Sequence, residues 1–276
     1  MLDIRVVIGE AKKTIVFLGT FDKENKPAFS ATGFLLRLDS VFHLATAKHV
    51  VVNPLTDKPR DGLMAFYNRK DGVVAVTNLQ SLIEEHEIRW VFHADPLVDV
   101  ALIPFPLNVS DDDVKTIPET VFKKSPDLFE LDDVFFLSYQ PGLEPHDKIR
   151  PVVRSGSISL LNADGTFYID AAAFPGNSGS PVFLKPSLLS YGEGTVAIGG
   201  PDDRGGRFVG IVGEYVPYQE WAISSQTNRP RVVFEENTGL SRIWSADFLG
   251  DIISSADFKD QTKRLQPKVL RSDKGE

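Results

Sequence analysis

Short apolar runs rich in Val, Ile, Phe and Thr follow one another along most of this chain, and Gly, Pro, Asn or Asp separates them. Runs of this length and composition are typical of β-strands, and almost no helical periodicity interrupts them. Many short strands joined by turns indicate an all-β sandwich or barrel. The expected strands are 14–20, 32–38, 41–47, 62–69, 72–78, 89–93, 99–105, 133–139, 151–161, 166–171, 180–184, 195–198, 207–216 and 231–235.

The strand pattern pauses between Pro106 and Asp133. This connection contains three prolines and the acidic run 110–113, and it has few sustained apolar runs. It divides the strands into two groups of about half a dozen, which is the usual size of one sheet or barrel. We therefore expect one barrel in residues 1–118, a second in residues 119–236, and a separate C-terminal segment in residues 237–276.

The C-terminal segment changes its hydrophobic period. Apolar side chains recur there at spacings of three and four, which predicts one amphipathic helix packed against a barrel or, alternatively, against a partner. Beyond Phe258 the chain is polar and contains Pro267, so we expect a frayed tail. The apolar positions of the predicted helix are Leu240, Ile243, Trp244, Phe248, Leu249, Ile252 and Ile253.

Residues 185–206 form an enlarged connection that ends in a turn rich in Gly and Asp at 199–206. Paired aspartates could hold a cation, but this turn lacks the regularly spaced oxygen ligands of a calcium loop. A surface hairpin tip is the preferred interpretation.

Composition excludes several classes of function. The 30 Lys and Arg residues against 38 Asp and Glu give a net charge of −8, which argues against a nucleic-acid partner. The chain has no cysteine, so disulfides, thiolate metal sites and cysteine nucleophiles are excluded. No apolar run is long enough to cross a bilayer and the N-terminus lacks a signal-peptide pattern, so we expect a cytoplasmic protein that does not bind membranes. Neither a metalloprotease motif nor a phosphate loop is present, and we expect no metal and no cofactor.

One stretch has the composition of a catalytic turn. Residues 174–181 read Phe-Pro-Gly-Asn-Ser-Gly-Ser-Pro and lie between two strand-like runs. Gly176 and Gly179 flank Ser178, and glycines allow a tight turn whose amides can approach a substrate oxygen. Ser178 is therefore a candidate nucleophile, provided that the chain supplies a base to accept its proton.

His49 is the best candidate for that base among five histidines. It follows the run 41–47 and precedes an irregular polar segment, a position from which a side chain can face a cleft. His43 lies in mid-strand, where a structural role is the simpler interpretation. The remaining histidines, His86, His93 and His146, stand in polar or charged surroundings.

Asp99 is the candidate for the acid that orients the base. It leads directly into the apolar run 100–105, and burial of an unpaired carboxylate is costly. A hydrogen bond to a histidine would offset that cost and fix the tautomer of the imidazole. Asp95, followed by Pro96, is better explained as a turn residue. Spacing alone leaves a structural role open for each of these residues.

Three segments carry a resemblance to a known family. Residues 46–51 (Thr-Ala-Lys-His-Val-Val), 99–103 (Asp-Val-Ala-Leu-Ile) and 176–181 (Gly-Asn-Ser-Gly-Ser-Pro) resemble the signature segments of chymotrypsin-fold serine proteases, in the family's order His, Asp, Ser. Residues 31–35, 153–159 and 170–178 are similar to the high-temperature-requirement (HtrA) branch. The resemblance extends from about residue 14 to the C-terminal helix.

The resemblance implies two six-stranded antiparallel β-barrels with the site in the cleft between them. His49 and Asp99 would come from the first barrel and Ser178 from the second. The backbone amides of Gly176 and Ser178 would form the oxyanion hole, which stabilises the tetrahedral intermediate.

The resemblance also implies a substrate-binding edge and a specificity pocket. The strand that contains Gly213, Glu214 and Tyr215 would pair with the substrate backbone as an added strand. Ala172 would lie at the base of the primary pocket. Because Ala172 offers no charge, we expect a small or medium apolar residue before the cut.

Three features depart from the family pattern. Ser180 replaces a glycine, Lys48 replaces a small residue and is expected to point to solvent, and no segment for a PDZ domain follows the predicted helix. Regulation by a homo-oligomer or an activating partner is therefore left open. Two functions remain: a serine endopeptidase that forms an acyl-enzyme on Ser178, or an inactive or partner-activated protein that binds extended peptides.

Overall fold

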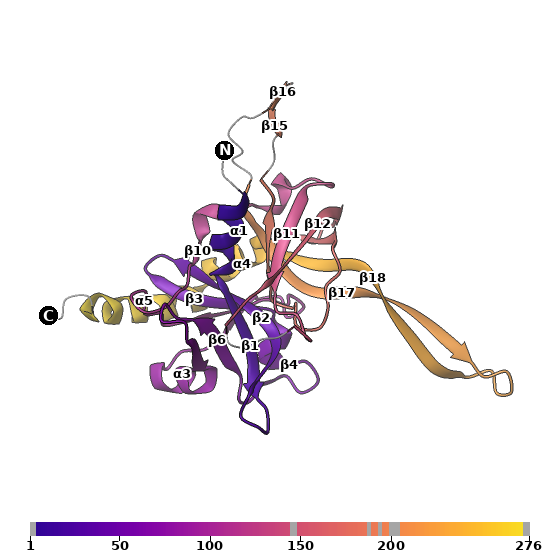
Figure 1. The fold of residues 1–276 in the computed structure, drawn as a ribbon, viewed down its shortest axis with the longest axis horizontal. Coiled ribbons are helices and arrows are strands. Elements are labelled where there is room, and N and C mark those ends of the chain that lie inside the picture. Colours follow the sequence, from indigo (N-terminus) through magenta and orange to yellow (C-terminus); the bar gives the residue numbers. More distant parts are fainter. Residues whose placement is uncertain (1–3, 144–147, 187–188, 193–194, 199–204, 273–276) are drawn as a thin grey trace.

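The computed structural model describes residues 4–143, 148–186, 189–192, 195–198 and 205–272. Its strands form an N-terminal sheet and a closed C-terminal barrel, which lie against each other with few helices around them (Figure 1). The predicted all-β, chymotrypsin-like fold class is confirmed: the second half closes into a six-stranded barrel as expected, whereas the first half forms an eight-stranded sheet. The turn predicted at 199–206 lies mainly outside the described residues.

The N-terminal sheet has eight strands, and its main path runs β7-β6-β1-β2-β3-β9-β8. All neighbours on this path are antiparallel, whereas β10 pairs with β2 in parallel. A short hairpin of β4 (Val52–Asn53) and β5 (Lys58–Pro59) follows the histidine segment. The sheet strands are β1 (Ile15–Phe21), β2 (Pro27–Leu38), β3 (Val41–Thr46), β6 (Met64–Asn68), β7 (Val74–Asn78), β8 (Val91–Phe92), β9 (Ala101–Pro104) and β10 (Ile117–Pro118).

The C-terminal barrel closes in the order β11-β12-β13-β18-β17-β14, with antiparallel neighbours throughout. A separate pair, β15 (Leu189–Gly192) and β16 (Thr195–Ile198), lies in the enlarged connection. The barrel strands are β11 (Asp133–Ser138), β12 (Val152–Leu161), β13 (Thr166–Asp170), β14 (Pro181–Leu184), β17 (Phe208–Ile223) and β18 (Pro230–Ser245).

Few helices accompany the strands. Helix α3 begins after Asn78, whose side-chain oxygen accepts hydrogen bonds from two backbone amides of the first turn. In the part of the chain that the structure describes, no helix is both long enough and apolar enough to cross a membrane. The helices are α1 (Ile4–Lys12), α2 (Lys48–Val51), α3 (Leu79–His86), α4 (Ala246–Ser254) and α5 (Ala256–Ser272), with 3-10 turns at Glu119–Val121 and Ser125–Asp127.

The C-terminal helix begins later than predicted. Leu240 to Ser245 are the end of β18, where Trp244 pairs with Thr166 of β13, and the helix starts at Ala246. Ile243 and Trp244 are both buried because the barrel interior covers one face of this strand and Phe248 of α4 packs on the ring of Trp244. Burial on both faces removes the alternation that normally marks a strand.

The tail predicted beyond Phe258 is also wrong, because α5 continues to Ser272. Phe258 packs on the ring of His43 in the N-terminal sheet, with centroids 5.0 Å apart. The Gln261 side chain accepts a hydrogen bond from the backbone amide of Arg89 and donates one to its carbonyl. These tertiary contacts hold a polar segment in a helix that its composition alone does not require.

One of the three hydrophobic clusters of the described core contains side chains from both sheets. Phe34 of the N-terminal sheet packs against Phe208 of the barrel, with ring centroids 5.3 Å apart, and Phe208 in turn contacts Phe183. All three side chains are almost completely buried. The halves are therefore fixed against each other, and residues from both can form one site.

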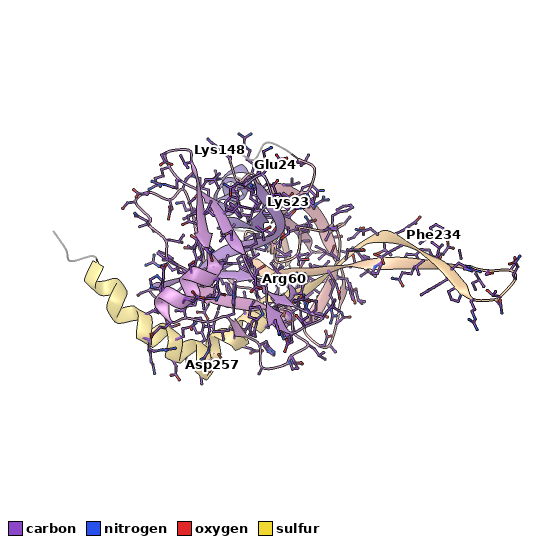
Figure 2. All side chains as sticks on the ribbon, turned by 90° about the horizontal axis from the view of Figure 1, so that it is seen from below. Lys23, Glu24, Arg60, Lys148, Phe234 and Asp257 are labelled. Carbon is purple, nitrogen blue, oxygen red and sulfur yellow. The ribbon has the colours of Figure 1, made fainter. Side chains whose placement is uncertain are left out.

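Strands β17 and β18 are much longer than predicted, at 16 residues each. Their barrel ends pair with β14 and β13, but their other ends pair only with each other over Pro217–Ile223 and Pro230–Asn237. Figures 1 and 2 show this two-stranded ribbon projecting away from the body of the molecule, and Phe234 lies on it. We call residues 216–237 the arm.

Candidate active site

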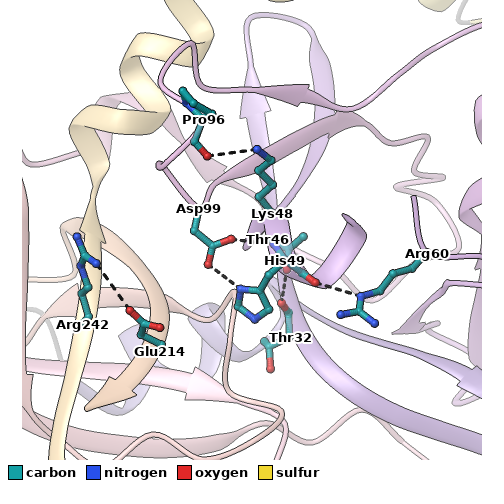
Figure 3. Close-up of polar contacts among 9 residues, drawn as sticks. All are labelled: Thr32, Thr46, Lys48, His49, Arg60, Pro96, Asp99, Glu214 and Arg242. Carbon is teal, nitrogen blue, oxygen red and sulfur yellow. Dashed lines mark hydrogen bonds and ion pairs between the residues drawn. The ribbon is translucent and has the colours of Figure 1, made fainter. Parts of the chain in front are cut away.

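His49 and Asp99 form a hydrogen-bonded pair at the edge of the N-terminal sheet (Figure 3). The Nδ1 atom of His49 lies 2.6 Å from Oδ2 of Asp99, and the other carboxylate oxygen accepts the backbone amide of His49 at 2.8 Å. Because a carboxylate accepts, Nδ1 carries the proton, and Nε2 is left as the atom that can take one. Asp99 thus fixes the backbone position, the ring orientation and the tautomer of His49.

Local structure explains how the pair forms. His49 lies in the first turn of α2, directly after β3, and Asp99 precedes β9, the neighbour of β3 in the sheet. Adjacent strands bring the two residues together although they are 50 positions apart. Arg60 donates to the carbonyl of His49 at 3.1 Å and further holds this turn.

Ser178 faces the same cavity as this pair. The cavity has a volume of about 730 Å³ and is lined by His49, Asp99 and Ser178. Gly213, Glu214 and Tyr215 line it as well. The structure therefore brings together the three residues of the predicted triad and the three of the predicted substrate-binding strand.

The loop that carries Ser178 is held from within by Asn177, which is completely buried. The Asn177 side-chain oxygen accepts the amide of Phe174 at 2.9 Å, and its nitrogen donates to the carbonyl of Tyr139 at 2.6 Å. The backbone amide of Asn177 donates to the carbonyl of Phe174. Three hydrogen bonds from one residue close the turn and attach it to the end of β11.

Thr32 of β2 attaches the same loop to the N-terminal sheet. Its hydroxyl donates to the carbonyl of Gly176 at 2.8 Å and accepts the amide of Tyr139 at 2.9 Å. Its backbone amide donates to the carbonyl of Ser178, and its own carbonyl accepts the hydroxyl of Thr46 at 2.8 Å. Thr32 and Thr46 are fully buried. Both sheets thus determine the position of the serine.

Two glycines in the loop are required by its backbone. Gly176 and Gly179 have φ values of +97° and +84°, in the region that favours glycine. A Cβ atom on Gly179 would lie 2.2 Å from the carbonyl oxygen of Thr32 and 2.2 Å from the hydroxyl of Thr46. The loop therefore packs so closely on β2 and β3 that no side chain fits at Gly179.

The amides of Gly176 and Ser178 are available to a ligand. Among the described residues, neither amide donates a hydrogen bond to the protein, although the neighbouring amides of Asn177, Gly179 and Ser180 all do. Two unused donors beside a nucleophile are what an oxyanion hole requires. The assignment of these amides to an oxyanion hole remains a prediction.

Ser180 fits the loop without backbone strain. It is not among the described residues with positive φ, so the Cβ that replaces the usual glycine costs little. Its backbone amide donates to the carbonyl of Asn177, and its carbonyl accepts the amide of Val212. Its hydroxyl is buried and has no hydrogen-bond partner within the described structure.

Two residues that the sequence did not reveal also line the cavity. Arg242 and Trp244 line it from β18, with the guanidinium 4.6 Å from the centre of the indole ring. The guanidinium lies 3.7 Å from the carboxylate of Glu214 (Figure 3). These residues were assigned to a helix, which hid their position on the strand next to β17.

Ala172 is half-buried and is not one of the residues that line this cavity, whereas its neighbour Ala173 is. Its place at the base of a specificity pocket therefore stays a prediction. The side chain of Lys48 makes two contacts at the surface. Its ammonium group donates to the carbonyl of Pro96 at 3.3 Å and lies 5.5 Å from the ring centre of Phe92.

A closed antiparallel barrel that packs on a second sheet, with a His–Asp pair and a serine facing one cavity between them, is the architecture of the chymotrypsin fold. The trypsin-like peptidase domain family matches residues 31–187, which is more than half of the chain, and the chain belongs to this family. No curated protein matches the chain. Membership supports a function of the serine-protease type. The matched region contains His49, Asp99 and Ser178 but ends before β17, β18 and the arm.

Proposed function

We propose that the protein is a serine endopeptidase. Ser178 attacks the carbonyl carbon of a peptide bond, and Nε2 of His49 takes the hydroxyl proton. The amides of Gly176 and Ser178 bind the oxyanion, and His49 returns its proton to the leaving amine. An acyl-enzyme on Ser178 results. Water, deprotonated by His49, then attacks the ester carbonyl, and the proton returns to Ser178 as the acid leaves.

A single observation carries this proposal. The 2.6 Å contact between Nδ1 of His49 and the carboxylate of Asp99 lies in the cavity that Ser178 lines. A carboxylate on Nδ1 directs the basic nitrogen away from itself and stabilises the imidazolium that forms during attack. Unrelated structural roles for His49, Asp99 and Ser178 would not explain why all three line one cavity with the His–Asp hydrogen bond in place.

The substrate in this proposal is an extended polypeptide. It pairs with Gly213–Tyr215 as an added strand and places a small or medium apolar side chain before the cut. The segments similar to the HtrA branch support an assignment of this protease to that branch. The exposed Glu214 borders the same cavity from β17.

A second candidate function is a peptide-binding protein of the same fold that is inactive or needs a partner to become active. It is favoured by one observation: among the described residues, no hydrogen bond joins the hydroxyl of Ser178 to His49. Hydrogen bonds of this type are often long before a substrate binds, so the endopeptidase proposal stands first.

Labelling with a fluorophosphonate probe tests the proposal, because the probe reacts only with an activated serine. We expect the folded wild type to label, the Ser178→Ala variant not to label, and the Asp99→Asn variant to label at least about a thousandfold more slowly. Labelling of Ser178→Ala at the wild-type rate would reject Ser178 as the nucleophile. Labelling of the wild type only after addition of cell extract would favour the partner-activated alternative.

Cleavage of a peptide library by the wild type, with Ser178→Ala as the blank, tests the proposed specificity. We expect cuts after small or medium apolar residues. A dominant preference for Lys or Arg before the cut would contradict the uncharged pocket. In that case Glu214 becomes the first residue to examine, because its carboxylate borders the cavity.

A further inference from the structure

The arm exposes far more apolar surface than the rest of β17 and β18. From Phe208 to Gly213 every residue of β17 is buried, whereas Tyr218, Trp221 and Ile223 are 54%, 56% and 59% exposed. On β18, Val232, Val233 and Phe234 are 42–58% exposed. An isolated two-stranded ribbon is at best marginally stable in water, and contiguous exposed apolar groups mark an interaction site.

We propose that the arm is an extension of the substrate site, which binds the part of a polypeptide substrate that lies N-terminal to the cut as a further strand on the free edge of β17. This inference rests on the proposed endopeptidase function and makes the length of substrate before the cut a determinant of cleavage.

The edge of β17 that faces the cleft leads into the arm, with register shifts between Val212 and Glu214 and between Tyr215 and Pro217. At Phe208–Ile211 this edge is occupied by β14, and at Val212 it is occupied by Gly179 and Ser180, whose backbone groups bond to that residue. From Gly213 onward, no described strand pairs with this edge as far as Ile223, while the opposite edge pairs with β18. The free edge therefore begins beside Ser178 and ends at the tip of the arm.

We take a bound chain to be antiparallel to β17, as β14 is. A substrate that continues the sheet on the same edge would run in the same sense as β14. Residues before the cut then lie toward the tip of the arm. Eight residues separate Gly213 from Trp221, which corresponds to about 26 Å of extended chain. Only substrates with about eight or more residues before the cut reach Trp221.

The side chains of the arm define what such a strand would contain. Trp221 lies opposite Val233 on one face of the ribbon, whereas Ala222 and Val232 lie on the other. An added strand would thus meet apolar groups on both faces and gain most from apolar side chains at successive positions. Folded proteins bury such segments, while unfolded chains expose them.

Charge adds a second preference. Glu220, Glu235 and Glu236 are exposed on the arm, and Arg229 and Arg231 lie at its tip. We expect the middle of the arm to favour Lys or Arg over Asp or Glu in the bound segment.

Two quenched peptides of identical sequence around the cut test the proposal, one with four residues and one with twelve residues before it. In the arm-deletion variant, Asn-Gly replaces residues 220–234, because Gln219 and Glu235 are direct cross-strand partners that a two-residue turn can join. This variant keeps the hydrogen bonds of Glu235 to Tyr215 and Gln219. The Trp221→Ser and Phe234→Ser variants form a matched pair, since the two side chains are 56% and 58% exposed.

We expect the wild type to cleave the long peptide with a kcat/KM about tenfold higher than the short one, mainly through a lower KM. The arm deletion should abolish that difference and leave cleavage of the short peptide within about twofold. Trp221→Ser should remove most of the gain, because Trp221 lies on the strand that receives the substrate. Phe234→Ser should keep it, because β18 is one strand further away.

Three results would overturn the inference while leaving the proposed function intact: equal kcat/KM for both peptides, an unchanged length effect after arm deletion, or equal losses in the two serine variants. The third result, combined with a change of mass in light scattering, would assign the arm to contact with a second copy of the chain. Failure of the wild type to cleave either peptide or to label at Ser178 would instead reject the endopeptidase function, and this inference with it.

Discussion

The two halves of β17 differ sharply in burial and in strand pairing. The half that runs from Phe208 to Gly213 is buried, paired on both edges for most of its length, and borders the loop of Ser178. The half that runs along the arm has one free edge and exposed aromatic side chains. One strand therefore serves two purposes: its buried half fixes the geometry of the cleft, and its exposed half leaves surface that a ligand can occupy.

This difference predicts where mutations affect folding and where they affect only recognition. Buried groups around the serine loop are packed and hydrogen-bonded on all sides, so changes there should reduce the free energy of unfolding. Changes on the arm remove few contacts and should leave that free energy unchanged. The four predictions below test this contrast, beginning with the largest expected effect.

Gly179→Ala should prevent stable folding or lower the free energy of unfolding by more than about 4 kcal/mol. The added Cβ would meet backbone and side-chain oxygens of Thr32 and Thr46 at 2.2 Å, in a conformation with φ of +84°. Gly72→Ala is the matched control, because its φ is +87° but no atom lies within 4 Å of the new Cβ. The control should lose only about 1–2 kcal/mol in urea unfolding. Equal losses in both variants would show that packing of the loop is unimportant.

Acidification should destabilise the buried region through His43. Burial lowers the pKa of this histidine from 6.5 to about 4, and its Nδ1 bonds to the carbonyl of Val41. Because the unfolded state binds the proton more readily, stability contributed by neutral His43 is complete above pH 6.5. It is lost as the pH falls toward 4, by up to about 3 kcal/mol.

Urea unfolding at pH 7 and pH 4.5 measures this effect. The His43→Asn variant should show a smaller loss between the two pH values than the wild type does, because its side chain does not titrate. An identical pH dependence in the two proteins would mean that His43 is not the responsible group.

Thr32→Val should lower the free energy of unfolding by about 2 kcal/mol and slow fluorophosphonate labelling of Ser178. The substitution keeps the shape of the side chain but leaves the buried amide of Tyr139 without its acceptor and the carbonyl of Gly176 without its donor. Thr20→Val, at an exposed position of β1, is the control and should change neither quantity. A Thr32→Val variant that labels as fast as the wild type would show that the Thr32 hydroxyl is not needed to position the loop.

Trp221→Ser should change the free energy of unfolding by less than about 0.5 kcal/mol. The side chain is 56% exposed and lies on the arm, outside the three buried clusters of the described core. Thermal unfolding followed by circular dichroism provides the measurement. A loss as large as that of Thr32→Val would remove the contrast between the two halves of β17, since the arm would then stabilise the fold.

The sequence predicted the strands and the members of the site better than it predicted lengths. Short β-branched runs were sufficient to locate the strands, because strand formation depends on neighbouring residues. The motif segments were likewise sufficient to select His49, Asp99 and Ser178 as candidate site residues. The length of β17 beyond Val216 was not predicted, since Pro217, Gln219 and Glu220 are not typical strand residues. Pairing with β18 keeps them extended, and such pairing is a property of the hairpin and not of either segment alone.

The other features that the sequence did not predict also depend on tertiary contacts. Trp244 was predicted to lie on a helix because burial on both sides of β18 removed the polar–apolar alternation that marks a strand. Arg242 was consequently overlooked as a residue that lines the cavity. The role of Thr32 could not be predicted without knowing which backbone groups of the C-terminal barrel lie against β2. A contact between residues 144 positions apart, such as that between Thr32 and Gly176, has no local signature in the sequence.

The link from Thr32 to the serine loop also has a consequence for biosynthesis. A chain that leaves the ribosome N-terminus first has synthesised His49 and Asp99 before Ser178. The C-terminal barrel is made later, and its Ser178 loop reaches the geometry described above by docking on β2. We therefore expect the proposed catalytic site to be completed late in folding, after both halves of the chain have been made.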